Sequence, residues 1–262
     1  MDLQLKGHTA LVAGSTKGIG FAIAKLLAAE GARAIISGRH QASVETAITR
    51  IKADHPTAEL SGLVADLATA QGVEAAKTQY PQVDILVNSM GIYERKDFEV
   101  IPDEDWQRFF DVNVMSGVRL SRAYLPGMKQ CNWGRIVFIS SESALHIPKE
   151  MVHYGMTKTA QLAVSRGIAE SCAGTGVTCN AVLPGPTATD GLKAAIETRR
   201  GDKTVEEYTS DFFANARPSS LLKRFAQPEE VASLVAYICS PLSSATNGAA
   251  LRVDGGIVRA CF

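Results

Sequence analysis

The sequence predicts one doubly wound α/β domain with a parallel sheet. Short apolar runs of strand type alternate with longer segments of helical periodicity along almost the whole chain of 262 residues. Such alternation is typical of parallel strands that helices cover on both faces. No linker, low-complexity segment or internal repeat divides the chain, so we expect residues 1–262 to form a single domain.

The expected elements follow one another in a regular order. Strands are expected at residues 9–13, 34–37, 60–64, 85–87, 135–140, 177–183 and 250–253. Helices are expected at residues 19–30, 42–53, 70–79, 103–128, 154–172 and 228–240. Each strand is followed by a segment long enough to return the chain to the same edge of the sheet, which is the requirement for a parallel sheet.

Residues 187–222 interrupt this order with a long, mixed and charged stretch. Long insertions in compact domains are often functional lids. We expect two short helices here, at residues 191–200 and 205–216, that form a lid over a substrate cleft. The lid should turn Leu192, Ile196, Phe212 and Phe213 inward and leave Arg199, Arg200 and Lys203 in solvent or facing an anionic substrate group. The alternative is a static segment packed against a neighbouring subunit.

Composition indicates a folded protein without a strongly charged partner. With 46% hydrophobic and 21% charged residues, the chain can form a full core and shows no bias toward disorder. The 27 basic and 27 acidic residues cancel, so no overall field favours nucleic acid or a membrane surface. Five cysteines without short paired spacing suggest reduced thiols and no metal site. Lacking a secretory signal or a membrane-spanning run, the protein is expected to be cytoplasmic.

A glycine-rich turn follows the first expected strand and leads directly into a helix. Glycines allow a tight turn that approaches a pyrophosphate, and the free N–H groups of the helix start supply an anion site. The alternative is an ordinary connection between a strand and a helix. The position of the glycine-rich turn in the first strand-helix unit favours dinucleotide binding. The candidate cofactor-binding residues of this turn are Gly14, Ser15, Lys17, Gly18, Ile19 and Gly20.

The end of the second expected strand favours NADP over NAD. A carboxylate at this position usually binds the 2′-hydroxyl of NAD, but the sequence here reads Ser37-Gly38-Arg39-His40. Arg39 and Lys17 could instead bind the 2′-phosphate of NADP through charge-assisted hydrogen bonds. The alternative is that both cations lie on a solvated surface, in which case NAD remains possible.

Tyr154 and Lys158 stand four residues apart in a helical segment, so both side chains leave the same helix face. An ammonium group close to a phenol lowers the phenol pKa and makes it a usable acid and base. This spacing is also common on ordinary helices. Ser141 strengthens the interpretation because it lies at the end of the fifth expected strand, the edge where ligands bind in α/β sheets.

These residues resemble the short-chain dehydrogenase/reductase family, which includes reductases of the 3-oxoacyl-ACP type. The resemblance extends from Gly14 to Gly256 and rests on ordered motifs. They are the glycine turn at 14–20, Asp66, Asn88, Asn113 within DVNV, Ser141 ahead of YxxxK at 154–158, Pro184-Gly185, and VDGG at 253–256. The family implies a Rossmann fold and an NADP-dependent oxidoreductase that interconverts a carbonyl and a secondary alcohol.

The resemblance assigns a catalytic role to four side chains. Tyr154 would be the general acid and base, and Lys158 would lower its pKa and hold the nicotinamide ribose. Ser141 would bind the reacting oxygen, and Asn113 would hold a water molecule in a proton relay. For Ser141 the alternative is a hydroxyl bonded to backbone, and for Asn113 an amide that bends its helix.

The resemblance also implies further cofactor contacts. Asp66, with Leu67 beside it, would bind the adenine amino group, although Asp66 could also be a plain helix cap. Asn88 would line the adenine ribose side. The remaining candidates are Gly91 and, in the loop for the carboxamide and phosphates, Pro184, Gly185, Thr187 and Thr189.

Three positions depart from the family pattern: Ala13 replaces a usual threonine, and Ser89 and Met90 stand where asparagine and alanine are usual. None touches the chemistry, but Ala13 and Met90 could change cofactor affinity and packing beneath the site. Candidate substrate-pocket residues flank the catalytic positions and have no assigned role: Ile92, Tyr93, Glu142, His146, Met151 and His153.

The family also implies a homotetramer, which would cover the apolar end of the chain at residues 249–262. The rival functions are a catalytically silent dinucleotide-binding regulator or scaffold, and an isomerase or dehydratase that uses bound cofactor. A regulator would be expected to lack Tyr, Lys or Ser at the site, and this chain has all three.

Overall fold

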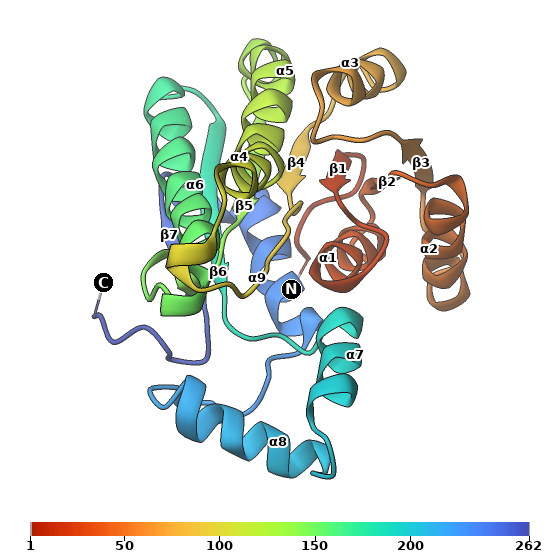
Figure 1. Ribbon diagram of the computed structural model, residues 1–262. Coiled ribbons are helices and arrows are strands. Elements are labelled where there is room, and N and C mark those ends of the chain that lie inside the picture. Colours follow the sequence, from red (N-terminus) through yellow and green to blue (C-terminus); the bar gives the residue numbers. More distant parts are fainter. Residues whose placement is uncertain (1, 262) are drawn as a thin grey trace.

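Seven parallel strands form one sheet in the order β3-β2-β1-β4-β5-β6-β7 in the computed structural model, which describes residues 2–261 (Figure 1). The strands are β1 (Thr9–Ala13), β2 (Arg33–Gly38), β3 (Leu60–Val64), β4 (Ile85–Asn88), β5 (Gly134–Ile139), β6 (Val177–Pro184) and β7 (Ala250–Val253). All seven expected strands are confirmed, with bounds that differ by one residue at most. The order reverses between β1 and β4, which are neighbours in space but not in sequence. This reversal opens a crevice at the carboxyl ends of the strands.

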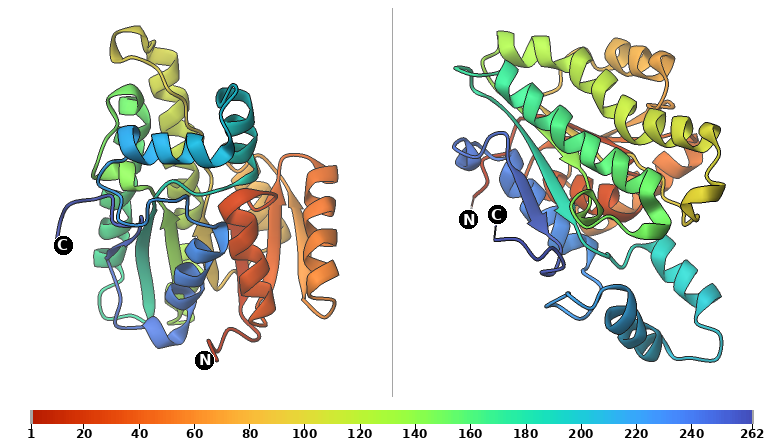
Figure 2. Two further views of the ribbon diagram at one scale, coloured as in Figure 1. Left: turned by 90° about the horizontal axis from the view of Figure 1, so that it is seen from below. Right: turned by 60° about the vertical axis from the view of Figure 1, so that its left-hand side comes forward.

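Helices cover both faces of the sheet, and the doubly wound prediction is confirmed (Figures 1 and 2). One face carries α1 (Gly18–Ala29), α2 (Gln41–Asp54) and α9 (Pro228–Cys239). The other carries α3 (Ala70–Gln79), α5 (Ser116–Gln130) and α6 (Val152–Ser171). Among residues 2–261, no helix is both long and apolar enough to cross a bilayer.

The strands are apolar on both sides because each face of the sheet has its own core. In β1, Val12 belongs to the cluster beneath α1 and α9, whereas Leu11 belongs to the cluster beneath α3 and α5. In β5, Val137 and Phe138 divide in the same way. Successive side chains of a strand point to opposite faces, so a strand buried on both faces needs an uninterrupted apolar run.

The expected helix at residues 103–128 is interrupted, and this prediction was wrong in its middle. Helix α4 (Asp103–Phe110) passes into a π-turn at Asp111–Met115 before α5 begins. The Ser116 N–H donates to the Asp111 carbonyl, five residues back, where an α-helix would span four. The apolar spacing continues across the turn, so periodicity does not reveal the extra residue. The turn holds Asn113.

The insertion forms α7 (Asp190–Arg199), α8 (Val205–Asp211) and a second π-turn (Phe212–Ala216), which lie beyond the two helical layers (Figure 1). The predicted inward residues do turn inward: Ile196 and Phe213 are buried against Phe225, with Leu192 and Phe212 packed on them. Arg199 is exposed. The other two cations form ion pairs near the surface, Arg200 with Glu197 at 2.8 Å and Lys203 with Asp211 at 2.5 Å.

The end of the chain fastens the last residues of the stretch 187–222. The N–H groups of Leu221 and Leu222 donate to the Gly255 carbonyl at 2.8 and 3.0 Å. Gly255 and the next residue, Gly256, have positive φ angles of 65° and 75°, which form the tight turn after β7. The last strand and this turn therefore position residues that come before α9 in the sequence.

Candidate active site

A cleft of about 600 Å³ lies at the carboxyl ends of the strands, over the point where β1 and β4 meet. It is lined by residues from the turns after β1, β2, β3 and β4 and from helix α6. Twelve of the proposed catalytic and cofactor-binding residues line it: Gly14, Lys17, Gly18, Ile19, Gly20, Arg39, Asp66, Leu67, Gly91, Tyr154, Lys158 and Thr189. The crevice thus joins the glycine turn to the Tyr-Lys helix.

The glycine turn has the backbone shape that close approach to an anion requires. Gly14 and Gly18 have positive φ angles of 73° and 60°. A Cβ on Gly20 would collide with the Gly14 carbonyl, so only glycine fits where α1 leaves the turn. Helix α1 begins at Gly18 without a side-chain cap, so its first N–H groups are available to a ligand.

Ser15 supports this turn from behind and does not line the cleft. It is fully buried; its hydroxyl accepts from the Ser37 N–H at 2.9 Å and its own N–H donates to the Ser37 carbonyl at 3.2 Å. The Ser37 hydroxyl in turn accepts from the Gly14 N–H at 3.0 Å. These bonds fix the turn after β1 to the end of β2. They therefore also fix the distance from the glycine turn to Arg39.

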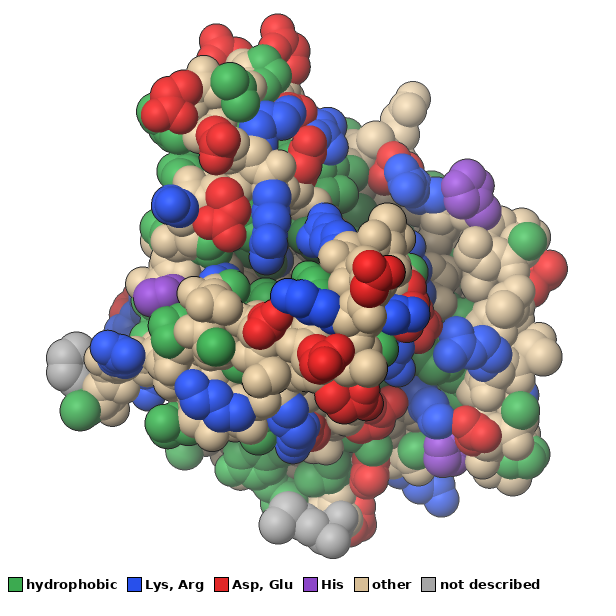
Figure 3. All heavy atoms as spheres, turned by 60° about the horizontal axis from the view of Figure 1, so that its bottom comes forward, with side chains coloured by type: hydrophobic (Ala, Val, Ile, Leu, Met, Phe, Trp, Pro, Cys, Tyr) green, Lys and Arg blue, Asp and Glu red, His purple; other side chains and the backbone are tan. Residues whose placement is uncertain are grey.

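Arg39 and Lys17 are both exposed and both border the cleft. Arg39 follows β2 and Lys17 immediately precedes α1, so the two cations come from neighbouring turns. Neither has an ion-pair partner among residues 2–261. Figure 3 shows the face that carries α7 and α8, where acidic and basic side chains are interspersed over the surface.

Asp66 lines the cleft, but it does not cap α3. Its carboxylate accepts from the Ala68 N–H at 3.1 Å, while the cap of α3 is Thr69, whose hydroxyl accepts from the Gly72 N–H at 3.0 Å. The alternative of a plain helix cap at Asp66 was therefore wrong. The nearer threonine takes that position because the chain makes a further turn after β3.

Four other proposed cofactor residues do not line the cleft. Asn88 is buried at the end of β4, with its Oδ1 unbonded. Pro184 ends β6, and Gly185 passes so close to β7 that a Cβ would lie 2.6 Å from the Asp254 carbonyl. Thr187 is buried, with its hydroxyl donating to the Gly185 carbonyl at 2.8 Å.

Thr189 lies opposite the glycine turn. Its hydroxyl caps α7 by accepting from the Leu192 N–H at 3.2 Å. Its methyl group would lie 3.4 Å from a Cβ on Gly18. Met90 approaches Gly14 in a similar way, at 3.3 Å from a Cβ placed there, so this departure from the family pattern fills space directly beneath the turn.

Tyr154 and Lys158 share one side of α6 and face the cleft together. The Lys158 ammonium lies 5.6 Å from the centre of the Tyr154 ring. It donates to the Ile139 carbonyl at the end of β5 at 2.9 Å and to Gln161 Oε1 at 3.4 Å. Tyr93, from the loop after β4, stands edge-on to Tyr154 at 6.5 Å between ring centres.

Burial shifts the pKa values of both Tyr154 and Lys158 away from their ordinary values. Burial raises the pKa of the Tyr154 phenol well above its ordinary value; the Ser141 hydroxyl opposes this, and Glu142 and Tyr93 add to it. Burial also lowers the pKa of the Lys158 ammonium to about 7. The net shift at Tyr154 is upward, and the lowering expected from Lys158 stays a prediction. The cost of burying a phenolate outweighs an ammonium that is bonded to backbone and amide oxygens.

Ser141 is buried at the end of the β5 segment, where it caps a short 3-10 turn at Glu142–Ala144. Its hydroxyl accepts from the Ser143 N–H at 3.1 Å and donates to Glu142 Oε2 at 2.5 Å. It does not belong to the lining of the cleft but lies next to it, beside Tyr154. Ser141 therefore lies close enough to Tyr154 to influence the pKa of its phenol.

Asn113 is enclosed by hydrogen bonds at the π-turn. Its amide accepts from the Ile92 N–H at 2.8 Å and donates to the Ile92 carbonyl and the Thr157 hydroxyl, each at 3.0 Å. Its backbone carbonyl accepts from the Gln161 amide at 2.5 Å. Asn113 therefore fixes the loop after β4 against α6.

Sequence reasoning missed Gln161 and Arg217. Gln161 is buried between the Asn113 carbonyl and the Lys158 ammonium, and its spacing of three residues from Lys158 on one helix was an available signal. Arg217 forms an ion pair with Glu142 at 3.0 Å across the fold. Nothing local in the sequence connects these two residues, which are separated by 75 positions.

The candidate substrate residues divide between the cleft and other environments. Ile92 and Tyr93 line the cleft, whereas His146 is exposed. His153 is buried on the far side of α6 against Phe109, at 4.1 Å between ring centres. Glu142 is buried, does not line the cleft and is bonded to the Ser141 hydroxyl.

The sequence matches a known protein family and several known relatives. A family model described as enoyl-(acyl carrier protein) reductase matches residues 13–258. An uncharacterized oxidoreductase of Bacillus subtilis, YvaG, is 48% identical over 264 residues that cover 100% of both chains. D-beta-hydroxybutyrate dehydrogenase of Cupriavidus necator is 33% identical, covering 97% of this chain and 99% of that one.

The fold comparison agrees with the sequence comparison. The structure of L-sorbose reductase from Gluconobacter frateurii, complexed with NADPH and L-sorbose, superposes with a TM-score of 0.92 at 29% identity. The match covers 99% of this chain and 100% of the reductase. With the glycine turn, the Ser-Tyr-Lys residues and the sheet order in one arrangement, the chain belongs to the short-chain dehydrogenase/reductase family.

Proposed function

We propose that the protein is an NADP-dependent oxidoreductase that transfers hydride between the nicotinamide and a carbonyl or secondary alcohol substrate. The observation that carries this proposal is a single cleft joining an open helix N-terminus to Tyr154 and Lys158. The first element is an anion site and the second a proton donor beside a cation. No feature of the site favours a silent regulator over an enzyme.

The residues of the cleft fit a dinucleotide. The uncapped N–H groups of α1 would bind the pyrophosphate, and Asp66 would meet the adenine at the carboxyl end of β3. The unbonded Oδ1 of Asn88 is a buried acceptor at the end of β4, on the proposed ribose side. Lys158 would hold the nicotinamide ribose, and Thr187 and Thr189 would hold the carboxamide and phosphate groups.

The preference for NADP rests on Arg39 and Lys17. Both are exposed at the cleft rim and come from adjacent turns, as a 2′-phosphate between them would require. The end of β2 supplies no carboxylate for a 2′-hydroxyl. The related L-sorbose reductase was solved with NADPH, which supports the same choice.

The proposed reaction assigns one task to each side chain. The bound cofactor supplies the hydride, and negative charge develops on the substrate oxygen as a carbonyl is reduced. Tyr154 donates its phenol proton to that oxygen, and the high pKa of the buried phenol keeps this proton in place at neutral pH. Ser141 binds the same oxygen. Lys158, held by the Ile139 carbonyl, places a cation next to the phenol as it loses its proton.

Asn113 would support this arrangement through the relay implied by the family. Its carbonyl meets the Gln161 amide, and the Gln161 oxygen meets the Lys158 ammonium. These bonds hold the Lys158 ammonium and the Asn113 carbonyl in fixed positions on either side of Gln161. The amide of Asn113 keeps that turn in register with the loop at Ile92.

The direct test is to incubate the protein with NADPH and a panel of small ketones, keto acids and ketoses, and to measure the loss of NADPH absorbance. The panel includes acetoacetate and L-sorbose because the two named relatives act on hydroxybutyrate and sorbose. Turnover of any member, abolished by Tyr154→Phe, supports the proposal. Tight NADPH binding without turnover of any carbonyl would instead support a dinucleotide-binding regulator.

A further inference from the structure

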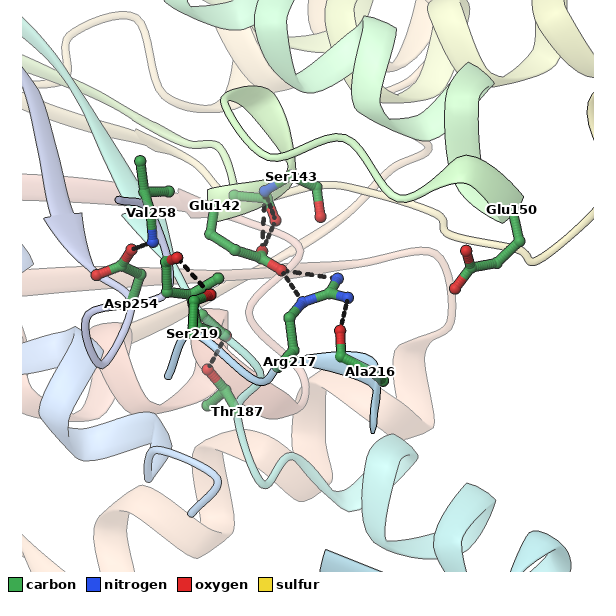
Figure 4. A network of polar contacts seen from close by, with 12 residues as sticks. Glu142, Ser143, Glu150, Thr187, Ala216, Arg217, Ser219, Asp254 and Val258 are labelled. Atoms are coloured by element: carbon green, nitrogen blue, oxygen red, sulfur yellow. Dashed lines mark hydrogen bonds and ion pairs between the residues drawn. The ribbon is translucent and has the colours of Figure 1, made fainter. Parts of the chain in front are cut away.

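Glu142 is a buried carboxylate directly behind Ser141, only 4% exposed. Its Oε2 accepts from the Ser141 hydroxyl at 2.5 Å and from the Ser143 N–H at 2.9 Å. Its Oε1 accepts from Arg217, with Nε at 3.1 Å and Nη2 at 3.0 Å (Figure 4). Both oxygens are thus bonded, and the buried charge is paired.

The hydrogen bonds at Ser141 leave it one free lone pair and no free proton. A serine hydroxyl has one hydrogen to donate and two lone pairs to accept with. The hydrogen goes to Glu142, and one lone pair takes the Ser143 N–H at 3.1 Å. With its hydrogen directed to Glu142, Ser141 can accept a hydrogen bond from the Tyr154 phenol. To donate to the phenol oxygen, which would lower the phenol pKa, Ser141 must first release its bond to Glu142.

Arg217 holds Glu142 from the opposite side of the site. It follows the π-turn Phe212–Ala216 within the insertion, and its N–H donates to the Phe212 carbonyl at 3.1 Å. Its Nη1 donates to the neighbouring Ala216 carbonyl at 2.9 Å (Figure 4). The guanidinium is itself buried, so its bond to Glu142 is shielded from solvent.

The negative charge of Glu142 affects the pKa of Tyr154 as well as the hydrogen bonding of Ser141. Four residues surround the Tyr154 phenol. Ser141 and Glu142 come from the segment after β5, and Tyr93 comes from the loop after β4. Lys158 lies one turn further along α6. Glu142 supplies the negative charge in this group. A carboxylate at this place opposes ionisation of the phenol, whereas Arg217 compensates the carboxylate itself.

We propose that Glu142, held by Arg217, is a positioning residue that takes the Ser141 hydroxyl hydrogen and so keeps Tyr154 as the proton donor of the pair. This inference rests on the proposed function. If Ser141 donated to the phenol oxygen, it would stabilise the phenolate and lower the phenol pKa that burial raises. The Glu142 carboxylate removes that competing hydrogen bond. When substrate binds, the Ser141 hydrogen can swing toward the reacting oxygen, because Glu142 keeps its bonds to Ser143 and Arg217.

Glu142→Gln tests the proposal in the full-length protein. The alkaline limb of the pH profile of kcat for carbonyl reduction should move to lower pH, because the neutral amide no longer opposes ionisation of Tyr154. The kcat should fall about fivefold to tenfold, the loss expected for one misdirected hydrogen bond, with KM nearly unchanged. In a Ser141→Ala background the same substitution should change kcat by less than about twofold.

Matched variants separate positioning from a merely structural role. Arg217→Lys keeps a cation opposite Glu142 and should keep the limb at its wild-type pH. Glu230→Gln breaks an exposed pair with Arg224, at 2.8 Å, away from the cleft and should change neither limb nor kcat. A purely structural pair predicts that Glu142→Gln lowers kcat without moving the limb, and that its effect multiplies with that of Ser141→Ala. Either result overturns the proposal.

Two further measurements keep the inference testable. If Glu142→Gln leaves Arg217 unpaired and the protein unfolded, the double variant Glu142→Gln, Arg217→Met removes both buried charges and takes its place. If the wild type reduces no carbonyl, the proposed function fails, and labelling of the six tyrosines at Cζ with ¹³C judges the inference alone. The Tyr154 signal, assigned with Tyr154→Phe, should begin to titrate at lower pH in Glu142→Gln; an unchanged titration would refute the role of Glu142.

Discussion

Tyr154 provides the proton in the proposed reaction, and Tyr154→Phe removes only that hydroxyl. We expect turnover to fall by about 10²-fold to 10⁴-fold, the usual contribution of general acid catalysis. NADPH affinity should stay within about threefold of wild type, because the phosphate contacts lie at the α1 turn. Steady-state kinetics and fluorescence titration with NADPH measure the two quantities, and near-normal turnover would contradict the mechanism.

Arg39 decides the choice of cofactor in the proposal. Arg39→Asp removes a partner of the 2′-phosphate and supplies an acceptor for a 2′-hydroxyl, so the ratio of kcat/KM for NADPH over NADH should fall at least about tenfold. Arg33→Asp is the control, because Arg33 is exposed at the opposite end of the same strand. A wild type that already prefers NADH would show that Arg39 and Lys17 are only surface cations.

Lys158 couples the site to stability because its pKa is lowered to about 7 by burial. Between that pH and the ordinary lysine pKa, the unfolded chain binds a proton that the folded protein does not, so folding becomes more favourable as pH rises. Below pH 7 both states are protonated and the burial cost is complete.

The consequence is measurable with Lys158→Met, which has no proton to bind. The free energy of unfolding of the wild type relative to this variant should rise by about 1 kcal/mol per pH unit between about pH 7 and pH 10. Urea unfolding of both proteins across this range gives the difference. A difference that does not change with pH would mean that Lys158 keeps its ordinary pKa in the folded protein.

At the scale of elements, the insertion that contains α7 and α8 is the part of the molecule that we expect to move when substrate binds. Its own cluster is small, with Ile196, Phe213 and Phe225 as the buried members, so we expect it to open more easily than the sheet. We propose that it closes over bound substrate and excludes water from the hydride transfer.

Hydrogen exchange across residues 190–216 tests this motion. Protection in this range should be weak in the free protein and should rise with NADPH and a substrate analogue, whereas protection in α6 should be strong in both states. Strong and unchanged protection of residues 190–216 in the free protein would show a static segment.

Periodicity and turn chemistry were sufficient to predict the strands, the glycine turn and the inward faces of α7 and α8, because these features depend on neighbours in sequence. The π-turn at Asn113 was not predictable, since the apolar spacing continues through it and the stabilising partners, Ile92 and Gln161, come from other elements. The pairing of Glu142 with Arg217 was hidden for the same reason. The partner of a buried charge cannot be identified from sequence when the two residues are brought together only by the fold.

At the scale of the whole molecule, we propose the homotetramer that the family resemblance implies. Leu221, 84% exposed, and the end of the chain near β7 leave apolar surface that a symmetric partner would cover. Light scattering at micromolar protein should report about four times the mass of one chain. A monomer at that concentration would refute this.

The turn at Gly255 ties the order of synthesis to the completion of the site. A chain emerging from the ribosome can form the glycine turn and the Tyr154 helix early, but Leu221 and Leu222 find their acceptor only when the turn after β7 appears. Arg217 lies just before these residues and docks on Glu142. We therefore expect a nascent or truncated chain that ends before residue 250 to form the cofactor crevice while Arg217 is not yet held against Glu142.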